Sequence, residues 1–115
     1  PILTRLVKAL PGADGAIFVD WEGEAVDRFD GTQHETPIRL VGAHWGIIYY
    51  LFRKAMERTG AGDPKQLVLS FETQTYVITQ VTSHYLIVVS MQPRINMRLA
   101  LDMSRITAQR LRREM

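Results

Sequence analysis

One segment of the chain, residues 36–60, predicts a helix with more apolar surface than a single core can cover. Thr36 is a good N-cap, Pro37 suits the first turn because its missing N–H has no partner there, and Gly60 provides a C-terminal stop. At about 100° per residue, the apolar side chains span roughly 200° of the helix circumference, about twice what one core requires. These residues are Ile38, Leu40, Val41, Trp45, Ile47, Ile48, Tyr49, Leu51, Phe52, Ala55 and Met56. The excess predicts that a partner covers part of the helix.

Two glycines, Gly42 and Gly46, lie one turn apart inside this predicted helix. Each costs about 1 kcal/mol relative to alanine, so the close approach of another backbone is a good reason for both. Chance or packing inside the chain is the alternative. We expect Gly42, Gly46, Tyr49 and Phe52 to contribute to an interface between two copies of the chain.

The 115 residues are enough for one domain with a real core, and we expect a single domain over residues 1–115. A short amphipathic helix opens the chain and ends at Pro11-Gly12. The remaining pattern predicts two strands, the long helix, three strands and a last helix. The predicted strands span residues 16–21, 25–29, 65–72, 75–81 and 85–91, and the last helix begins near residue 94.

The apolar pattern also predicts the order of the strands. Residues 17–19 and 86–89 are apolar on both faces, which is typical of central strands, whereas the second and third strands alternate more, as edge strands do. A sheet order of 2-1-5-4-3 satisfies this pattern. The predicted fold class is therefore α/β (α+β), with a five-stranded, mostly antiparallel sheet sandwiched by helices.

The third strand, residues 65–72, is then an exposed edge. Leu67, Leu69 and Phe71 lie along it, with few charges to block pairing with another strand. We therefore expect this edge to be paired in the native protein, and we assign these three residues to the same homodimer interface as the long helix.

Composition excludes several classes of function. The chain has no cysteine, which excludes disulfides and thiolate metal sites and fits a cytoplasmic protein. A net charge of +2 is too small to indicate nucleic-acid binding. Residues 2–10 are too short and too polar for a secretion signal, and no apolar run approaches the ~20 residues of a membrane span.

The sequence contains no recognisable catalytic arrangement, so we expect no enzyme activity, no cofactor and no metal. His34, His44 and His84 are scattered, and we interpret His44 as a packed or interface residue. The acidic residues between positions 14 and 30 do not match a calcium loop, and turn formation explains most of them. Residues 60–65 hold two glycines and a lysine, but they follow a helix and precede a strand, the reverse of a phosphate loop.

Four arginines lie within roughly 40° of one another on the last predicted helix. They are Arg94, Arg98, Arg105 and Arg112. The simplest interpretation is a solvated helix face. The alternative is contact with an anionic partner or membrane surface.

Taken together, these features resemble the Roadblock/dynein light chain family, and within it the bacterial MglB-like regulators. The resemblance spans nearly the whole chain and rests on the order of elements rather than on one decisive motif. Met97 is a departure, because a glycine commonly follows the asparagine in the family. The matching segments are Leu6-Val7, residues 11–16, Asp20, Gly23, the long helix, residues 76–78, residues 86–89 and Asn96 at the start of a helix rich in leucine and arginine.

The resemblance implies a homodimer in which the third strands pair edge to edge and the long helices lie together on one face. It also implies a small Ras-like GTPase as partner, which such proteins regulate as activators or exchange factors or hold as scaffolds, without cofactor or chemistry of their own. A ligand-sensing domain of profilin-like or PAS-like build is the alternative, and a small enzyme is a more distant one. Dense apolar residues in the sheet argue against a roomy ligand pocket.

The arc of the long helix left by the apolar residues is the predicted contact for the GTPase. Small residues there form a shallow floor, and tyrosine and arginine are enriched at binding hot spots. Arg39 or Arg53 is a candidate for reaching the nucleotide of the partner. The predicted partner-binding residues are Arg39, Ala43, Tyr50, Arg53, Lys54 and Glu57, with Gly46 between them.

Overall fold

The computed structural model describes residues 2–30 and 38–115. The predicted N-cap Thr36, the adjacent Pro37 and His34 lie outside these residues. The described elements, which follow the predicted order, are α1 (Ile2–Ala9), β1 (Ala13–Asp20), β2 (Ala25–Asp30), α2 (Ile38–Met56), a 3-10 turn (Glu57–Thr59), β3 (Gln66–Ser70), β4 (Thr75–Thr82), β5 (Tyr85–Met91) and α3 (Met97–Glu114).

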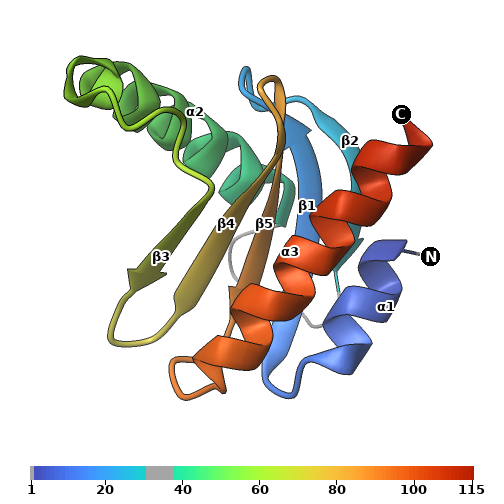
Figure 1. The fold of residues 1–115 in the computed structure, drawn as a ribbon. Helices are drawn as coiled ribbons and strands as arrows, with labels where there is room; N and C mark the ends of the chain where they lie inside the picture. Colours follow the sequence, from blue (N-terminus) through green and yellow to red (C-terminus); the bar gives the residue numbers. More distant parts are fainter. Residues whose placement is uncertain (1, 31–37) are drawn as a thin grey trace.

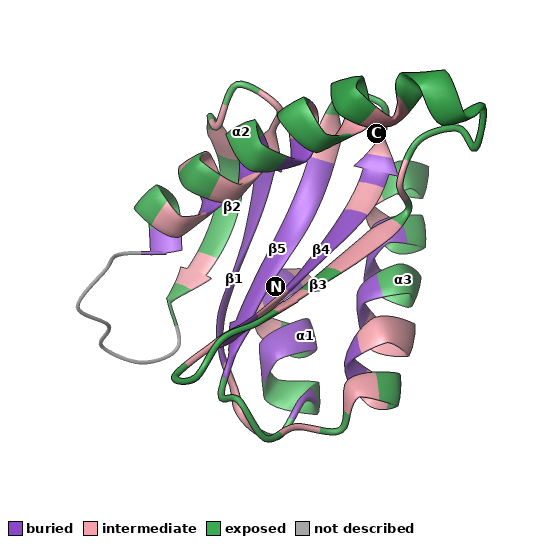
Figure 2. Ribbon diagram, turned by 90° about the vertical axis from the view of Figure 1, so that its left-hand side faces the viewer, coloured by how far each residue is buried: buried purple, intermediate pink, exposed green. Residues whose placement is uncertain are grey.

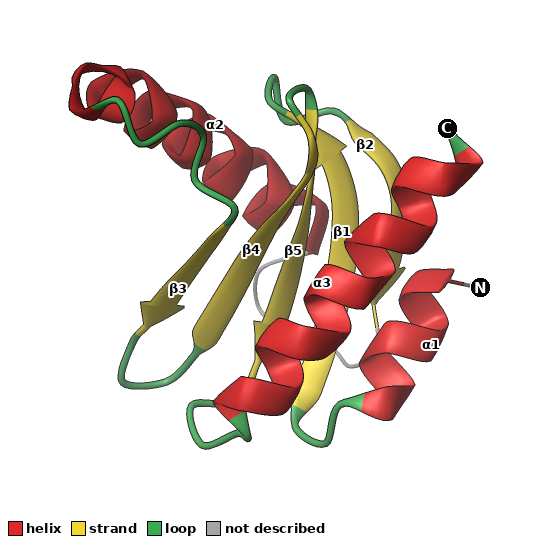
Figure 3. Cartoon of the chain, viewed as in Figure 1, coloured by secondary structure: helices red, strands yellow, loops and turns green. Residues whose placement is uncertain are grey.

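The five strands form one antiparallel sheet in the order β2-β1-β5-β4-β3, which confirms the predicted order. Helix α2 covers one face of this sheet, while α1 and α3 lie side by side on the other (Figure 1). The three layers are therefore helix, sheet and helix pair (Figure 3). Because β1 and β5 are covered on both faces, they carry nearly continuous apolar sequences.

Alternate residues of the central strands supply two separate cores. Phe18 and Ile87 face α1 and α3, where they pack with Leu3 and Leu6. Ile17 and Val88 face α2, where they pack with Ile38 and Tyr49. The members of that second core are Ile17, Val19, Ile38, Tyr49, Ile78, Leu86 and Val88. The period-two alternation of the strands thus decides which helix each side chain meets.

The two glycines of α2 let the helix lie directly on β1 of its own chain. A Cβ on Gly42 would stand 2.6 Å from Ile17 Cγ2, and a Cβ on Gly46 would stand 3.2 Å from the carbonyl oxygen of Asp20. Tyr49, on the same side of the helix, is fully buried. The prediction that Gly42, Gly46 and Tyr49 form a dimer interface is therefore wrong, because the close backbone approach occurs within the chain.

Gly60 ends the helical segment after α2 as predicted, and Asn96 caps the start of α3. Gly60 adopts the left-handed conformation with φ of 71°, and its N–H donates to the carbonyl of Glu57 at 3.4 Å. Asn96 caps α3 by accepting a hydrogen bond from the backbone N–H of Leu99 at 3.0 Å. Because this cap defines the helix start, α3 begins at Met97 rather than near residue 94 as the apolar pattern suggested.

The packing at Gly42 generates a test of how α2 is held. Gly42→Val places branched atoms where Ile17 and Val19 already lie, and it should lower the free energy of unfolding by about 1–3 kcal/mol. Ala55→Val, on the exposed side of α2, should cost only about 0.5 kcal/mol through helix propensity. Urea denaturation of both variants measures the difference. Equal stability of the two would contradict the packing of α2 on β1.

Candidate functional site

The most unusual surface of the chain is the side of α2 that faces away from the sheet. Five large apolar side chains are exposed there at helical spacing, with exposed fractions between 37% and 56%. Figure 2 shows this outward side of α2 as a mostly exposed band. We call these residues the exposed stripe: Leu40, Ile47, Ile48, Leu51 and Phe52. A continuous apolar stripe of this kind is typical of a surface that another protein covers.

An aromatic cluster joins the exposed stripe to the edge of the sheet. Trp45 of α2 lies with its ring centroid 5.2 Å from that of Tyr76 and 5.9 Å from that of Phe71, just beyond the end of β3. Phe71 is 49% exposed, and burial raises the pKa of Tyr76. His44 is exposed beside this cluster, with its ring edge against Trp45 at 5.0 Å. The apolar surface therefore continues from the helix to the edge strand.

Strand β3 is an edge, as predicted, and within the described chain it pairs with β4 alone. Two hydrogen bonds show which residues of β3 direct their backbone groups to β4. The Gln80 N–H donates to the carbonyl of Lys65 at 2.9 Å, and the Phe71 N–H donates to the carbonyl of Gln74 at 2.8 Å. Odd-numbered residues of this strand therefore direct their backbone groups to β4. The even-numbered residues Gln66, Val68 and Ser70 direct theirs to the open edge.

The predicted interface residues divide between this surface and the interior. Phe52 and Phe71 are exposed on it, whereas Leu67 and Leu69 are half-buried beneath α2. The stripe residues Leu40, Ile47, Ile48 and Leu51 were not assigned to the interface, although their spacing already separated them from the buried positions. The stronger signal was the repeat at positions 40, 44, 47, 48, 51, 52 and 55, which marks one side of a helix.

The predicted partner-binding residues do not form the outward face of α2. Ala43 packs against Gly23, and Tyr50 stacks on Trp21 with ring centroids 4.8 Å apart. Arg39, Lys54 and Glu57 are exposed, and Lys54 and Glu57 form an ion pair at 3.5 Å. The predicted arc therefore faces the chain's own β1–β2 turn in part, and the exposed stripe is the outward face.

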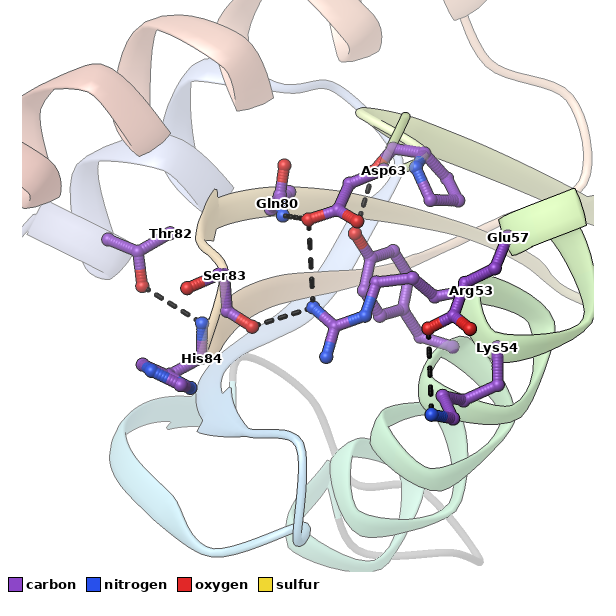
Figure 4. A network of polar contacts seen from close by, with 10 residues as sticks. Arg53, Lys54, Glu57, Asp63, Gln80, Thr82, Ser83 and His84 are labelled. Atoms are coloured by element: carbon purple, nitrogen blue, oxygen red, sulfur yellow. Dashed lines mark hydrogen bonds and ion pairs between the residues drawn. The ribbon is translucent and has the colours of Figure 1, made fainter. Parts of the chain in front are cut away.

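Arg53 belongs to a network that attaches the C-terminal half of α2 to two loops (Figure 4). Its Nη1 donates to the carbonyl of Ser83 at 2.6 Å and lies 3.9 Å from the carboxylate of Asp63. Asp63 also accepts a hydrogen bond from Gln80 Nε2 at 3.0 Å. The Arg53 side chain is only 15% exposed, so it is committed to this network and is not free to reach a partner's nucleotide.

Two of the acidic side chains between positions 14 and 30 have structural roles. The carboxylate of Asp20 accepts the N–H groups of Glu22 and Glu24 and shapes the first hairpin. Asp14 is buried and accepts a hydrogen bond from Gln74 Nε2 at 2.7 Å. Across residues 2–30 and 38–115, no group of three acidic or histidine side chains is placed to hold a metal ion.

Among the helices described, none has the length and apolar character needed to cross a membrane.

Comparison with known protein families identifies one domain in the chain. A model of the Roadblock/LC7 domain matches residues 2–91. No curated protein sequence matches the chain.

Solved structures share the fold at low sequence identity. The chain is similar to a Roadblock/LC7 domain from Streptomyces avermitilis, with a TM-score of 0.86 and 18% identity over 98% of this chain and 93% of that one. It is similar to MglB of Myxococcus xanthus, with a TM-score of 0.86 and 16% identity over 97% and 89% of the two chains. The gliding protein MglB of Thermus thermophilus gives a TM-score of 0.87 and 12% identity over 97% and 84%.

The anchor at Tyr49 generates a pH-dependent prediction. The Tyr49 hydroxyl donates to the carbonyl of Pro64 at 2.6 Å, and burial raises the pKa of Tyr49 from 10.0 to about 12. The folded state therefore holds this proton more tightly than the unfolded state does. The stabilisation is fully present below about pH 10 and is lost as the pH rises through about 12, where roughly 2–3 kcal/mol disappears.

Tyr49→Phe removes both the hydrogen bond and the titration. At pH 7 the variant should be less stable by about 1 kcal/mol, and this deficit should shrink and reverse as the pH approaches 12. Chemical denaturation of both proteins across this range isolates Tyr49, because all other titrating groups are shared. A deficit that is independent of pH would show that Tyr49 is not buried as described.

Proposed function

The chain belongs to the Roadblock/LC7 family, and from this premise we propose that it is a non-catalytic regulator or scaffold that binds a small Ras-like GTPase as a homodimer. The observation that carries the proposal is the continuity of the exposed stripe with the open edge of β3. An apolar helix face and an unpaired strand edge each favour association, and here one partner can cover both.

A second copy of the chain satisfies both surfaces with a single two-fold axis. The edge-facing residues Gln66, Val68 and Ser70 are symmetric about Val68, so two β3 strands can pair antiparallel with Val68 opposite Val68 of the second copy. A two-fold axis perpendicular to the sheet keeps both α2 helices on the same face. Their exposed stripes then meet across the axis, above a continuous sheet of both copies.

The GTPase is proposed to dock on the side of the paired α2 helices that the exposed stripes leave uncovered after they meet. Arg39 and Lys54 are exposed near opposite ends of each helix, and Glu57 follows immediately after it. Charged residues at the margin of an apolar area steer encounter and select the partner. The proposed role for the dimer is to bind the GTPase and reposition the partner's own groups, since Arg53 is already engaged by Ser83.

The dimer has a test that separates the strand edge from the fold. Val68→Pro removes one edge-facing N–H and leaves the β4 ladder intact, so the chain should stay folded while the dimer is lost. Val68→Thr keeps that N–H and serves as the matched control. Light scattering at micromolar concentration should give twice the chain mass of 13.1 kDa for the native protein and the control. It should give a single chain mass for Val68→Pro.

A native protein that is monomeric at this concentration would exclude the homodimer. A Val68→Pro variant that is folded and still dimeric would exclude pairing through β3.

The GTPase contact has an independent test. Arg39→Glu combined with Lys54→Glu should weaken binding by about tenfold, since both cations lie at the proposed margin of the contact. Titration calorimetry against Ras-like GTPases from the same genome measures this affinity. Arg98→Glu combined with Arg110→Glu applies the same charge change on α3 and should leave it unchanged.

If the α3 variant loses affinity while the α2 variant does not, the GTPase docks on the opposite face of the sheet. If no GTPase binds the native dimer, the proposed partner is wrong.

A further inference from the structure

The opposite face of the sheet carries a groove that the proposed function does not use. Helix α3 covers β4 and β5, and β3 extends beyond it at the far edge of the sheet (Figure 3). Between α3 and the β3 side of the sheet lies a groove of about 490 Å³. Its main polar lining residues are Lys65, Gln66, Thr79, Arg105, Gln109 and Arg112. A volume of this size can hold several residues of a peptide or a small molecule.

The lining of this groove is strongly one-sided in charge. Lys65, Arg105 and Arg112 contribute three cations, and none of the lining residues that the structure describes carries a carboxylate. Asp102, outside the lining, accepts a hydrogen bond from Arg105 Nη2 at 3.1 Å on an exposed part of α3. An exposed pair of this kind is weak. The groove therefore keeps a net positive charge, which favours an anionic ligand.

Two side chains of the groove are held in place by the chain itself. Arg112 donates from Nε to the carbonyl of Val81 at 2.8 Å, which fixes its guanidinium plane over the sheet. Gln66 donates from Nε2 to Thr79 Oγ1 at 3.1 Å and to the carbonyl of Leu101 at 3.0 Å. A side chain that is already ordered loses less entropy when a ligand binds. These contacts therefore order the side chains of one wall and of the floor of the groove before a ligand binds.

The spacing of the cations distinguishes between kinds of anion. Arg105 and Arg112 are seven residues apart on α3, which places them roughly 10 Å apart along the helix axis, with Gln109 on the turn between them. In a peptide with the polyproline II conformation, which has three residues per turn, side chains three residues apart lie on the same side and are separated by roughly 9 Å. With Arg112 held on the carbonyl of Val81, a ligand with two separated anionic groups fits this spacing better than a single phosphate, and a concave site does not match the flat surface of a bilayer.

We propose that this groove binds an acidic segment of a partner protein in the polyproline II conformation. Two carboxylates of the segment, three residues apart, pair with Arg105 and Arg112, and Lys65 lines the same groove. Hydrogen bonds between guanidinium and carboxylate groups are stronger than neutral ones and favour this planar geometry. The amide of Gln109 lies between the arginines, where it can bond the peptide backbone.

The test uses the full chain and a fluorescein-labelled extended peptide in which glutamate occupies every third position among serines. Fluorescence polarisation should show binding that weakens with added salt, and the same peptide with glutamine in place of glutamate should not bind. Arg105→Glu combined with Lys65→Glu should weaken binding by about tenfold or more. Arg98→Glu combined with Arg110→Glu makes the same charge change on exposed positions outside the groove and should have less than a twofold effect.

Thermal denaturation must show that both double variants are folded. If the variant with Arg105→Glu and Lys65→Glu is unfolded, the variant with Arg105→Gln and Lys65→Gln replaces it. Equal loss of binding in the groove variant and the control would overturn the proposal, because it would indicate net charge rather than a site. Failure of the glutamate peptide to bind would also overturn it. The proposal would also be overturned if the native protein bound phosphatidylserine vesicles but not the peptide, and the groove variant lost this vesicle binding.

Discussion

The contact between α2 and β1 at Gly42 determines how the rest of this structure is exposed. Without a side chain at Gly42 or Gly46, the helix lies directly on Ile17, Val19 and the end of β1. That approach fixes which side of α2 faces the sheet. The buried side carries Ile38 and Tyr49, and the large apolar residues on the other side are left exposed. A helix held farther from the sheet by alanine side chains could rotate or tilt, and a different set of apolar side chains would then be exposed.

Much of the fold follows from the sequence because each central strand has a distinct apolar pattern. The two-sided apolar runs of β1 and β5 identified them as neighbours in the middle of the sheet, and the short β4–β5 connection placed β4 beside them. The C-terminal stop at Gly60 was equally predictable, since it has a local physical reason. The start of α3 was misjudged because apolar periodicity alone does not show that Asn96 ends the preceding turn.

The candidate site was predicted less well, for a reason that lies in the helix itself. The sequence showed that α2 has more apolar surface than one core needs. It did not show which part of this wide apolar arc packs on the sheet and which part stays exposed. The interface was assigned around the glycines, whereas those positions meet the sheet and the excess lies on the other side. Tyr50 and Arg53 look like binding residues by type, yet Trp21 and Ser83 of the same chain engage them. Such long-range contacts, 29 and 30 residues apart, cannot be seen in a local pattern.

The way α2 is fastened has a consequence for how such chains can diverge. The helix is held by Gly42 and Gly46 along its length, and by Tyr49 and Arg53 through the carbonyls of Pro64 and Ser83 near its C-terminal end. None of these fastenings uses a side chain of the exposed stripe. Substitutions within the stripe therefore leave the folding of the chain largely untouched and, under the proposed function, alter only what it associates with. A gene duplication could acquire a new pairing preference by changing a few stripe residues, with the subunit architecture inherited intact.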